Sequence, residues 1–268
     1  MGLMLMADLG LLRERLTNLG RVVVAFSGGA DSAFLAWMAN DTLGRDRVLV
    51  ATAVSPSLAP SELADCHALA EEWGLRWVGL DTRELARPEY VANGADRCYH
   101  CKAELLDALG PLAAAEAATV VLAVNVDDLG DHRPGQQAAH ERGAQFPLVD
   151  TGFTKADVRR CSESLGLRTW DKTAAACLAS RLPYGTPVTV RRLAAVADAE
   201  EALHRLGFRQ VRVRHYGDVA RIELDLPDLA AALSRRVEII SAIKAAGYRY
   251  VTLDLEGFRS GNLNGALS

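Results

Sequence analysis

The sequence lacks a surplus of positive charge, a long apolar run and a basic leader. Its 268 residues carry 30 Lys and Arg against 34 Asp and Glu, a formal net charge of −4, whereas proteins that hold nucleic acid concentrate positive charge. Glu116 interrupts the apolar stretch 112–124, which falls short of the about 20 residues of a membrane span. Residues 1–8 lack the basic start of an export signal. We therefore expect a cytoplasmic protein that binds neither nucleic acid nor a membrane; binding of a single nucleotide stays open.

The five cysteines exclude a complete disulfide framework, because the number is odd. Cys66 and Cys161 share helix faces with apolar residues, so we interpret both as small core residues. The other three, Cys98, Cys101 and Cys177, stand among polar residues and require another explanation.

Several chemistries fit these three cysteines. The Cys98-x-x-Cys101 pair alone is compatible with a redox pair or with no function. With Cys177, and with His100 as a fourth ligand, it could form a closed zinc site. Three thiolates can also hold a [4Fe–4S] cluster and leave one iron open. The residues alone favour the cluster without excluding zinc or the absence of a metal.

The hydrophobic pattern predicts an α/β fold with a parallel sheet flanked by helices. Continuous apolar runs predict buried strands at 22–26, 48–54, 77–80 and 119–124, with helices near 32–43, 61–73, 99–117 and 155–165 between them. Beyond residue 185 the pattern changes to a helix at 189–206, a hairpin of 211–215 and 219–224, a helix at 234–246 and a strand at 250–253. We therefore predict a nucleotide-binding domain over 1–185 and a smaller α+β domain over 186–268.

A phosphate-binding loop follows the first predicted strand. The segment 27–32 reads Ser-Gly-Gly-Ala-Asp-Ser: Gly28 and Gly29 let the backbone approach a ligand, and the following helix directs N–H groups at it. Ser27 and Ser32 add hydroxyl groups. Asp31 would repel phosphate directly, which suits it to holding Mg²⁺. The motif resembles the PP-loop of the ATP pyrophosphatases, a resemblance that implies ATP as cofactor and adenylation of a substrate.

A longer series of segments resembles the LarE family of PP-loop sulfurtransferases, which help to build the nickel-pincer nucleotide cofactor. Besides the loop, the matching segments are 125–135, 179–186, 211–214, 220–224 and 247–254. The resemblance implies a small nucleotide substrate, pyridinium-3,5-biscarboxylic acid mononucleotide, whose carboxylates are adenylated and then attacked by sulfur. It also implies a homo-oligomer based on trimers and a downstream nickel-inserting enzyme.

The LarE family has two sulfur strategies, and this sequence resembles the second. One branch sacrifices the sulfur of a single cysteine, and Ala176 occupies that position here. The other branch carries Cys-x-x-Cys and a later cysteine. The resemblance therefore implies that Cys98, Cys101 and Cys177 hold a [4Fe–4S] cluster, with Cys177 at the reaction centre.

The remaining candidate site residues are polar groups near predicted strand ends. Arg212 and Arg214 lie two apart on a predicted strand and so share a face, where their guanidinium groups could bind the substrate phosphate; a solvated strand face is the alternative. Arg181, next to Ser180, is a candidate for the reaction centre, and the resemblance adds Glu200 to the phosphate-binding set. A polar loop after the fourth strand contains Asn125, Asp127, Asp128, Asp131 and Arg133, of which Asn125 and Asp128 are assigned to ATP.

Three other functions stay open at this point. Thiolation of tRNA by a related PP-loop enzyme is the main alternative, although the charge balance argues against tRNA binding. An ammonia-using amide ligase would have no need of the three cysteines. A nucleotide-binding or sulfide-storage module would have little use for an aspartate in the phosphate loop.

Overall fold

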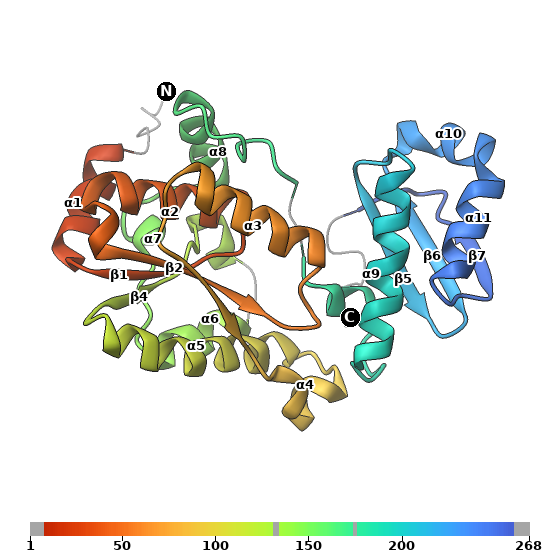
Figure 1. Cartoon of the computed structure of the whole chain (residues 1–268), viewed down its shortest axis with the longest axis horizontal. Coiled ribbons are helices and arrows are strands. Elements are labelled where there is room, and N and C mark those ends of the chain that lie inside the picture. Colours follow the sequence, from red (N-terminus) through yellow and green to blue (C-terminus); the bar gives the residue numbers. More distant parts are fainter. Residues whose placement is uncertain (1–7, 131–133, 174–175, 260–268) are drawn as a thin grey trace. The chain divides into compact units, whose positions relative to one another are not determined.

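The computed structural model describes residues 8–130, 134–173 and 176–259 (Figure 1); Asp131 and Arg133 lie outside these ranges. The helices are α1 (Leu9–Leu19), α2 (Ala30–Leu43), α3 (Pro60–Glu72), α4 (Pro88–Ala92), α5 (Arg97–Ala115), α6 (Pro134–Glu141), α7 (Pro147–Asp150), α8 (Lys155–Ser164), α9 (Val190–Arg205), α10 (Leu229–Ser234) and α11 (Arg236–Ala245). The strands are β1 (Val22–Ala25), β2 (Val48–Val54), β3 (Trp77–Asp81), β4 (Thr119–Val121), β5 (Val211–Tyr216), β6 (Val219–Leu224) and β7 (Tyr250–Leu253). Short 3₁₀ turns include η3 (Val126–Gly130) and η4 (Leu178–Arg181).

The described residues form two compact units. Of the described residues, the first comprises 8–55, 62–84, 98–130 and 134–173, and the second 56–61, 85–97 and 176–259. The second unit thus includes two short segments from the first half of the sequence. The proposed division into domains 1–185 and 186–268 stays a prediction.

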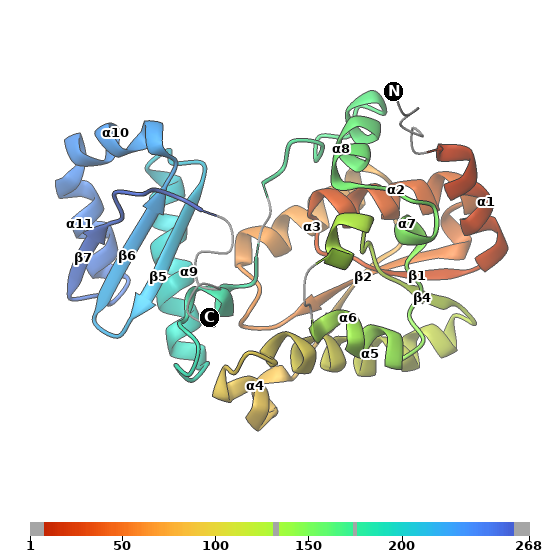
Figure 2. The ribbon, with the colours of Figure 1, turned by 180° about the vertical axis from the view of Figure 1, so that it is seen from behind.

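The first unit contains the predicted parallel sheet, in the order β3-β2-β1-β4. Helices cover both faces of the sheet (Figures 1 and 2). Val22 and Val24 pack with Phe34 and other residues of α1, α2, α3 and α8, whereas Val23 packs with Leu109 and other residues of α5 and α6. Burial on both faces is the reason that these strands read as continuous apolar runs. The α/β fold class is confirmed.

The second unit contains a smaller sheet with one apolar face. β5 and β6 form the predicted antiparallel hairpin, and β7 pairs with β6 in parallel. Val213 and Ile222 pack with Leu203 of α9 and Ile243 of α11. Alternate positions point away from this core, so Arg212 and Arg214 share the other face of the sheet, as their spacing predicts.

Several predicted boundaries were wrong. The fourth strand ends at Val121, short of the predicted end at 124, and an isolated parallel bridge joins Val121 to Gln145. The predicted helix at 234–246 is confirmed as α11, and α10, which ends just before it at Ser234, was not predicted. Two short amphipathic helices, α1 and α6, were not predicted.

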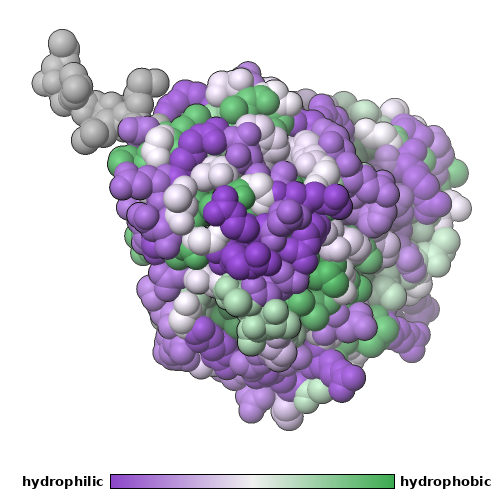
Figure 3. Space-filling model, turned by 60° about the vertical axis from the view of Figure 1, so that its left-hand side comes forward, coloured by the Kyte–Doolittle hydropathy of each residue, from purple (hydrophilic) through white to green (hydrophobic). Residues whose placement is uncertain are grey.

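No helix of the described ranges is long and apolar enough to cross a membrane. The face shown in Figure 3 is largely hydrophilic, with apolar groups scattered between the polar ones.

Candidate active site

The phosphate loop is braced by its two serines. The Ser27 N–H donates to Ser32 Oγ over 3.2 Å, the two hydroxyl oxygens lie 3.1 Å apart, and Ser32 Oγ donates to the Gly29 carbonyl over 3.1 Å. The loop joins β1 to α2, and Gly29 is the residue that precedes the helix. The first turn of α2 thus begins at the loop, as a phosphate site at a helix N-terminus requires.

Gly28 meets two separate requirements for glycine. Its φ is +68°, and a Cβ built on it would lie 2.9 Å from Cys66 Sγ of α3. Cys66 is fully buried, as expected for a core residue, and burial raises the pKa of its thiol. A side chain at position 28 would therefore strain the backbone and displace the loop from α3.

We expect Gly28→Ala to lower ATP cleavage by about 10²-fold, because small displacements of catalytic groups have effects of that size. The rate of pyrophosphate release measures this loss of ATP cleavage. Gly20→Ala is the matched control: its φ is +75°, but a Cβ there meets nothing within 4 Å. Equal losses of ATP cleavage in both variants would contradict the role assigned to the loop contact.

An acidic corner adjoins the loop at the carboxyl ends of β1 and β4. Burial raises the pKa of Asp31, and the Asp128 carboxylate raises it further. Asp128 lies 2.9 Å from Lys155 Nζ, and it exchanges hydrogen bonds with Asn125: each backbone N–H donates to the other side chain. Asn125 Nδ2 is buried without a hydrogen-bond partner among the described residues. The two carboxylates fit Mg²⁺, and the Asn125 amide N–H fits an acceptor atom of a polar ligand.

The start of α8 is fixed next to this corner. Thr154 and Asp157 form a capping box, and the Lys155 N–H donates to the Asp127 carboxylate over 2.7 Å. The hydrogen bonds with Thr154, together with the nearby Arg160 guanidinium, hold the pKa of Asp157 low despite its burial, so the cap stays charged at neutral pH. This cap orients Lys155 toward Asp128.

Lys172 is a cation beside the loop that the sequence analysis missed. Its Nζ donates to Glu62 over 2.9 Å and to Asp65 over 2.6 Å, and it lies 3.7 Å from the position of a Cβ built on Gly28. Burial alone would lower the pKa of Lys172, but the two carboxylates raise it. The loop sequence has no lysine or arginine of its own, so only the fold could reveal this one.

The three predicted cluster cysteines are divided between the two units: Cys98 and Cys101 belong to the first, and Cys177 belongs to the second. Cys98 is exposed and Cys101 half-buried in the first turns of α5, whereas Cys177 is exposed just before η4 in the second unit. The i,i+3 spacing places Cys98 and Cys101 on one helix face, and thiolates are the donors that iron–sulfur clusters take. Within the described ranges, no three His, Cys, Asp or Glu side chains are grouped to hold a metal ion. The shared cluster stays a prediction.

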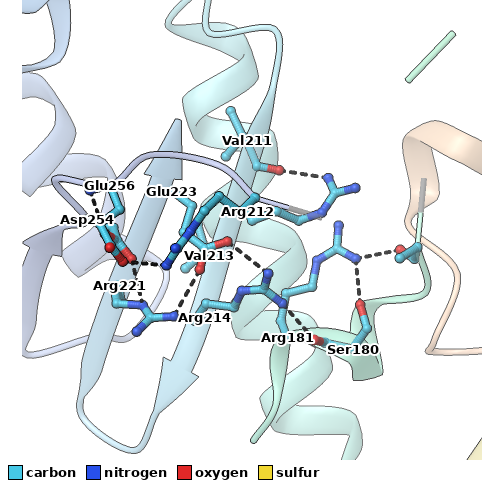
Figure 4. A network of polar contacts seen from close by, with 12 residues as sticks. Ser180, Arg181, Val211, Arg212, Val213, Arg214, Arg221, Glu223, Asp254 and Glu256 are labelled. Carbon is cyan, nitrogen blue, oxygen red and sulfur yellow. Dashed lines mark hydrogen bonds and ion pairs between the residues drawn. The ribbon is translucent and has the colours of Figure 1, made fainter. Parts of the chain in front are cut away.

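The second unit contains a buried network of arginines and glutamates (Figure 4). Arg181 donates from Nε and Nη2 to the two oxygens of Glu200, both over 2.9 Å. Arg214 donates to Glu223 over 2.8 Å, and Arg221 to the same carboxylate over 3.0 Å. Removing one partner from such a buried pair costs about 3–5 kcal/mol. Glu200 is therefore buried in an ion pair with Arg181.

Arg212, on β5, lies half-buried in the same network (Figure 4). Its Nη1 donates to the Val211 carbonyl, and its guanidinium lies 5.2 Å from the Phe258 ring. Burial and the nearby Arg181 guanidinium lower the pKa of Arg212 to about 10. A half-buried cation next to other cations favours an anionic ligand, so this arginine fits the predicted phosphate-binding role.

A nucleotide-binding protein of the PP-loop class is defined by three features of this site. They are the strand–loop–helix, the hydrogen bonds between Ser27 and Ser32 within the loop, and the acidic corner. Residues 11–91 match the sequence family described as NAD synthase. A protein of Lactiplantibacillus plantarum named pyridinium-3,5-bisthiocarboxylic acid mononucleotide synthase is 40% identical over 94% of this chain and 92% of its own length. The chain therefore belongs to the LarE family of PP-loop enzymes.

Two further relatives have no assigned function. An uncharacterized protein of Synechocystis sp. is 47% identical over 99% of this chain and 100% of its own length. An uncharacterized protein of Methanocaldococcus jannaschii is 26% identical over 93% of this chain and 94% of its own length. All three matches span both units of the structure.

Proposed function

We propose that the protein is an ATP-dependent sulfurtransferase that converts the carboxylates of pyridinium-3,5-biscarboxylic acid mononucleotide into thiocarboxylates. The observation that carries the proposal is the pairing of two features in one chain. A phosphate loop with an acidic corner suits adenylation, and Cys177 of the second unit combines an exposed thiol with a backbone carbonyl that accepts a hydrogen bond from Arg181. Family membership supports the same reaction, because the relative from Lactiplantibacillus plantarum is named for the thiocarboxylate product.

In the first step ATP activates a carboxylate. A carboxylate oxygen of the substrate attacks the α-phosphorus of ATP, and pyrophosphate leaves. Ser27, Gly28, Gly29 and Ser32 would bind the phosphates, and Asp31 would hold Mg²⁺, which neutralises charge on them when bound. Asn125 and Asp128 complete the nucleotide site. The step turns a poor leaving group into AMP.

In the second step sulfur replaces AMP. A sulfur nucleophile attacks the acyl-adenylate carbon, and AMP leaves with the former carboxylate oxygen. We propose that Cys98, Cys101 and Cys177 ligate a [4Fe–4S] cluster, whose open iron would supply sulfide as the nucleophile. Arg212 and Arg214, with Ser180 and Glu200, would bind the substrate phosphate, and Arg181 acts near the reaction centre.

The test is a reaction with anaerobically purified protein reconstituted with iron and sulfide. We expect pyrophosphate, AMP and the thiocarboxylate to form together from ATP, sulfide and the substrate, as resolved by mass spectrometry. AMP without thiocarboxylate in the wild type would overturn sulfur transfer, and tight tRNA binding at physiological salt would favour the alternative of tRNA thiolation. Analytical sedimentation measures the mass of the assembly in solution and so tests the proposed trimer-based homo-oligomer. A cytoplasmic location and a downstream nickel-inserting enzyme complete the proposal.

A further inference from the structure

Four backbone carbonyls around Cys177 accept hydrogen bonds from buried arginines. Arg181 Nη1 donates to the carbonyls of Ala176 over 2.6 Å and of Cys177 over 3.1 Å. Arg97 Nη1 donates to the Ala179 carbonyl over 2.9 Å, and Arg214 Nη1 to the Ser180 carbonyl over 3.0 Å. The three arginines come from three separate parts of the sequence and all belong to the second unit.

Each arginine is itself held by a buried polar side chain. Arg97 donates to Asn93 Oδ1 over 2.6 Å, Arg181 is paired with Glu200, and Arg214 with Glu223, which is fully buried. The exposed fractions of the three arginines are 5%, 3% and 6%. Charged groups are almost never buried to this extent without a specific role or partner.

The supporting residues are fixed in turn. Asn93 has a φ of +57°, and its Nδ2 donates to the carbonyls of Pro183 over 2.8 Å and of Thr186 over 2.9 Å. The Val213 N–H donates to Glu200 Oε1 over 2.9 Å. The contacts therefore continue from the Cys177 turn into β5 and into the segment that follows η4.

The thiol remains exposed although its turn is buried. Leu178 and Ala179 are 2% and 0% exposed, and the Leu178 N–H donates to the Ser57 carbonyl over 2.9 Å. Cys177 itself is exposed. The arginines bond to the backbone of the turn, so the contacts fix its path and leave the sulfur accessible.

We propose that Arg97, Arg181 and Arg214 are positioning residues that fix the Cys177 turn for sulfur transfer. The inference rests on the proposed function and refines it: in addition to the roles proposed above, Arg181 and Arg214 act through the backbone of the turn. The acyl-adenylate has two fates, attack by sulfur to give the thiocarboxylate and AMP, or attack by water to return the carboxylate and AMP. A fixed turn favours the first, because reaction rates depend steeply on the alignment of the nucleophile.

The test compares Arg97→Lys, Arg181→Lys and Arg214→Lys. Lysine keeps the charge but lacks the planar fork that bonds to two acceptors at once. We expect the yield of thiocarboxylate per pyrophosphate released to fall about tenfold in each variant, because this ratio reports the fate of the acyl-adenylate and not how fast it forms. Arg192→Lys is the matched control, because Arg192 also donates to a carbonyl in the second unit, that of Pro187, but is less buried.

Hydrogen exchange of the protein without substrate or cluster gives an independent measurement. We expect the Leu178 and Ser180 amides to exchange at least tenfold faster in the three variants, and the amides of α9 to keep the wild-type rate. Unchanged coupling of pyrophosphate release to thiocarboxylate, or faster exchange throughout the unit, would overturn the positioning role. If the wild type makes no thiocarboxylate but the three variants still show faster exchange of the Leu178 and Ser180 amides, the proposed function would be overturned and the fixed turn would not.

Discussion

Asp31→Asn is expected to lower ATP cleavage by about 10²–10³-fold, the usual effect of removing one group that stabilises developing charge. Asn cannot supply the anionic oxygen that Mg²⁺ prefers, and the neighbouring Asp128 is paired with Lys155. The measurement is pyrophosphate release at saturating Mg²⁺ and ATP. Asp41→Asn is the control, because Asp41 lies on the same helix and pairs with Arg13 at the surface.

The same substitution is expected to raise the melting temperature of the ligand-free protein at neutral pH. Burial and Asp128 raise the pKa of Asp31 above its ordinary value. The folded state therefore binds this proton more tightly than the unfolded state, so stability is present below the unfolded pKa of Asp31 and is lost as the pH rises through the folded pKa. The asparagine variant has no such charge and avoids the loss at pH 7.

The pH dependence of ATP cleavage distinguishes a role of Asp31 in holding Mg²⁺ from a role in stabilising the fold. In the wild type at subsaturating Mg²⁺ we expect ATP cleavage to decline on acidification at a higher pH than an ordinary aspartate would give, because Asp31 must be ionised to bind Mg²⁺ and its pKa is raised in the ligand-free protein. An inactive Asp31→Asn variant with a lower melting temperature at pH 7 would show that the carboxylate stabilises the fold instead. Full activity of the variant would remove Asp31 from the nucleotide site.

The sequence contained enough to predict the first unit because its signals are local. Residues 22–26 and 27–32 are contiguous, so the strand, the loop and the helix start could be predicted together. The spacing of Arg212 and Arg214 on one strand likewise predicted their shared face. These predictions need only the periodicity of a strand and the directionality of a helix end.

The contacts around Cys177 could not be predicted, because they join distant residues. Arg97 directly precedes Cys98, but nothing in its neighbours indicates that it binds the Ala179 carbonyl. Glu223 alternates with apolar residues as an exposed strand residue would, yet it is fully buried between two arginines. Burial of a charge depends on partners that only the fold brings close. The same holds for Lys172, far in sequence from the loop that it adjoins.

Cys177→Ser is expected to abolish thiocarboxylate formation, by at least about 10²-fold, while pyrophosphate release continues. A serine hydroxyl is a far weaker nucleophile and iron ligand than a thiolate. The carbonyl contacts of Arg181 involve the backbone of residues 176 and 177, so the turn should persist in the variant. The iron content per chain and the visible absorption of the reconstituted protein are the measurements that do not depend on turnover.

Cys161→Ser is the control for the loss of any one cysteine, because Cys161 is a buried core residue of α8 and burial raises its thiol pKa. We expect this variant to keep its iron and its sulfur transfer. Cys98→Ser and Cys101→Ser should lose iron as Cys177→Ser does if all three thiolates hold one cluster. Iron retained only in Cys177→Ser would leave Cys177 as a reacting thiol outside the cluster, whereas full iron in all three variants would exclude the predicted ligand set.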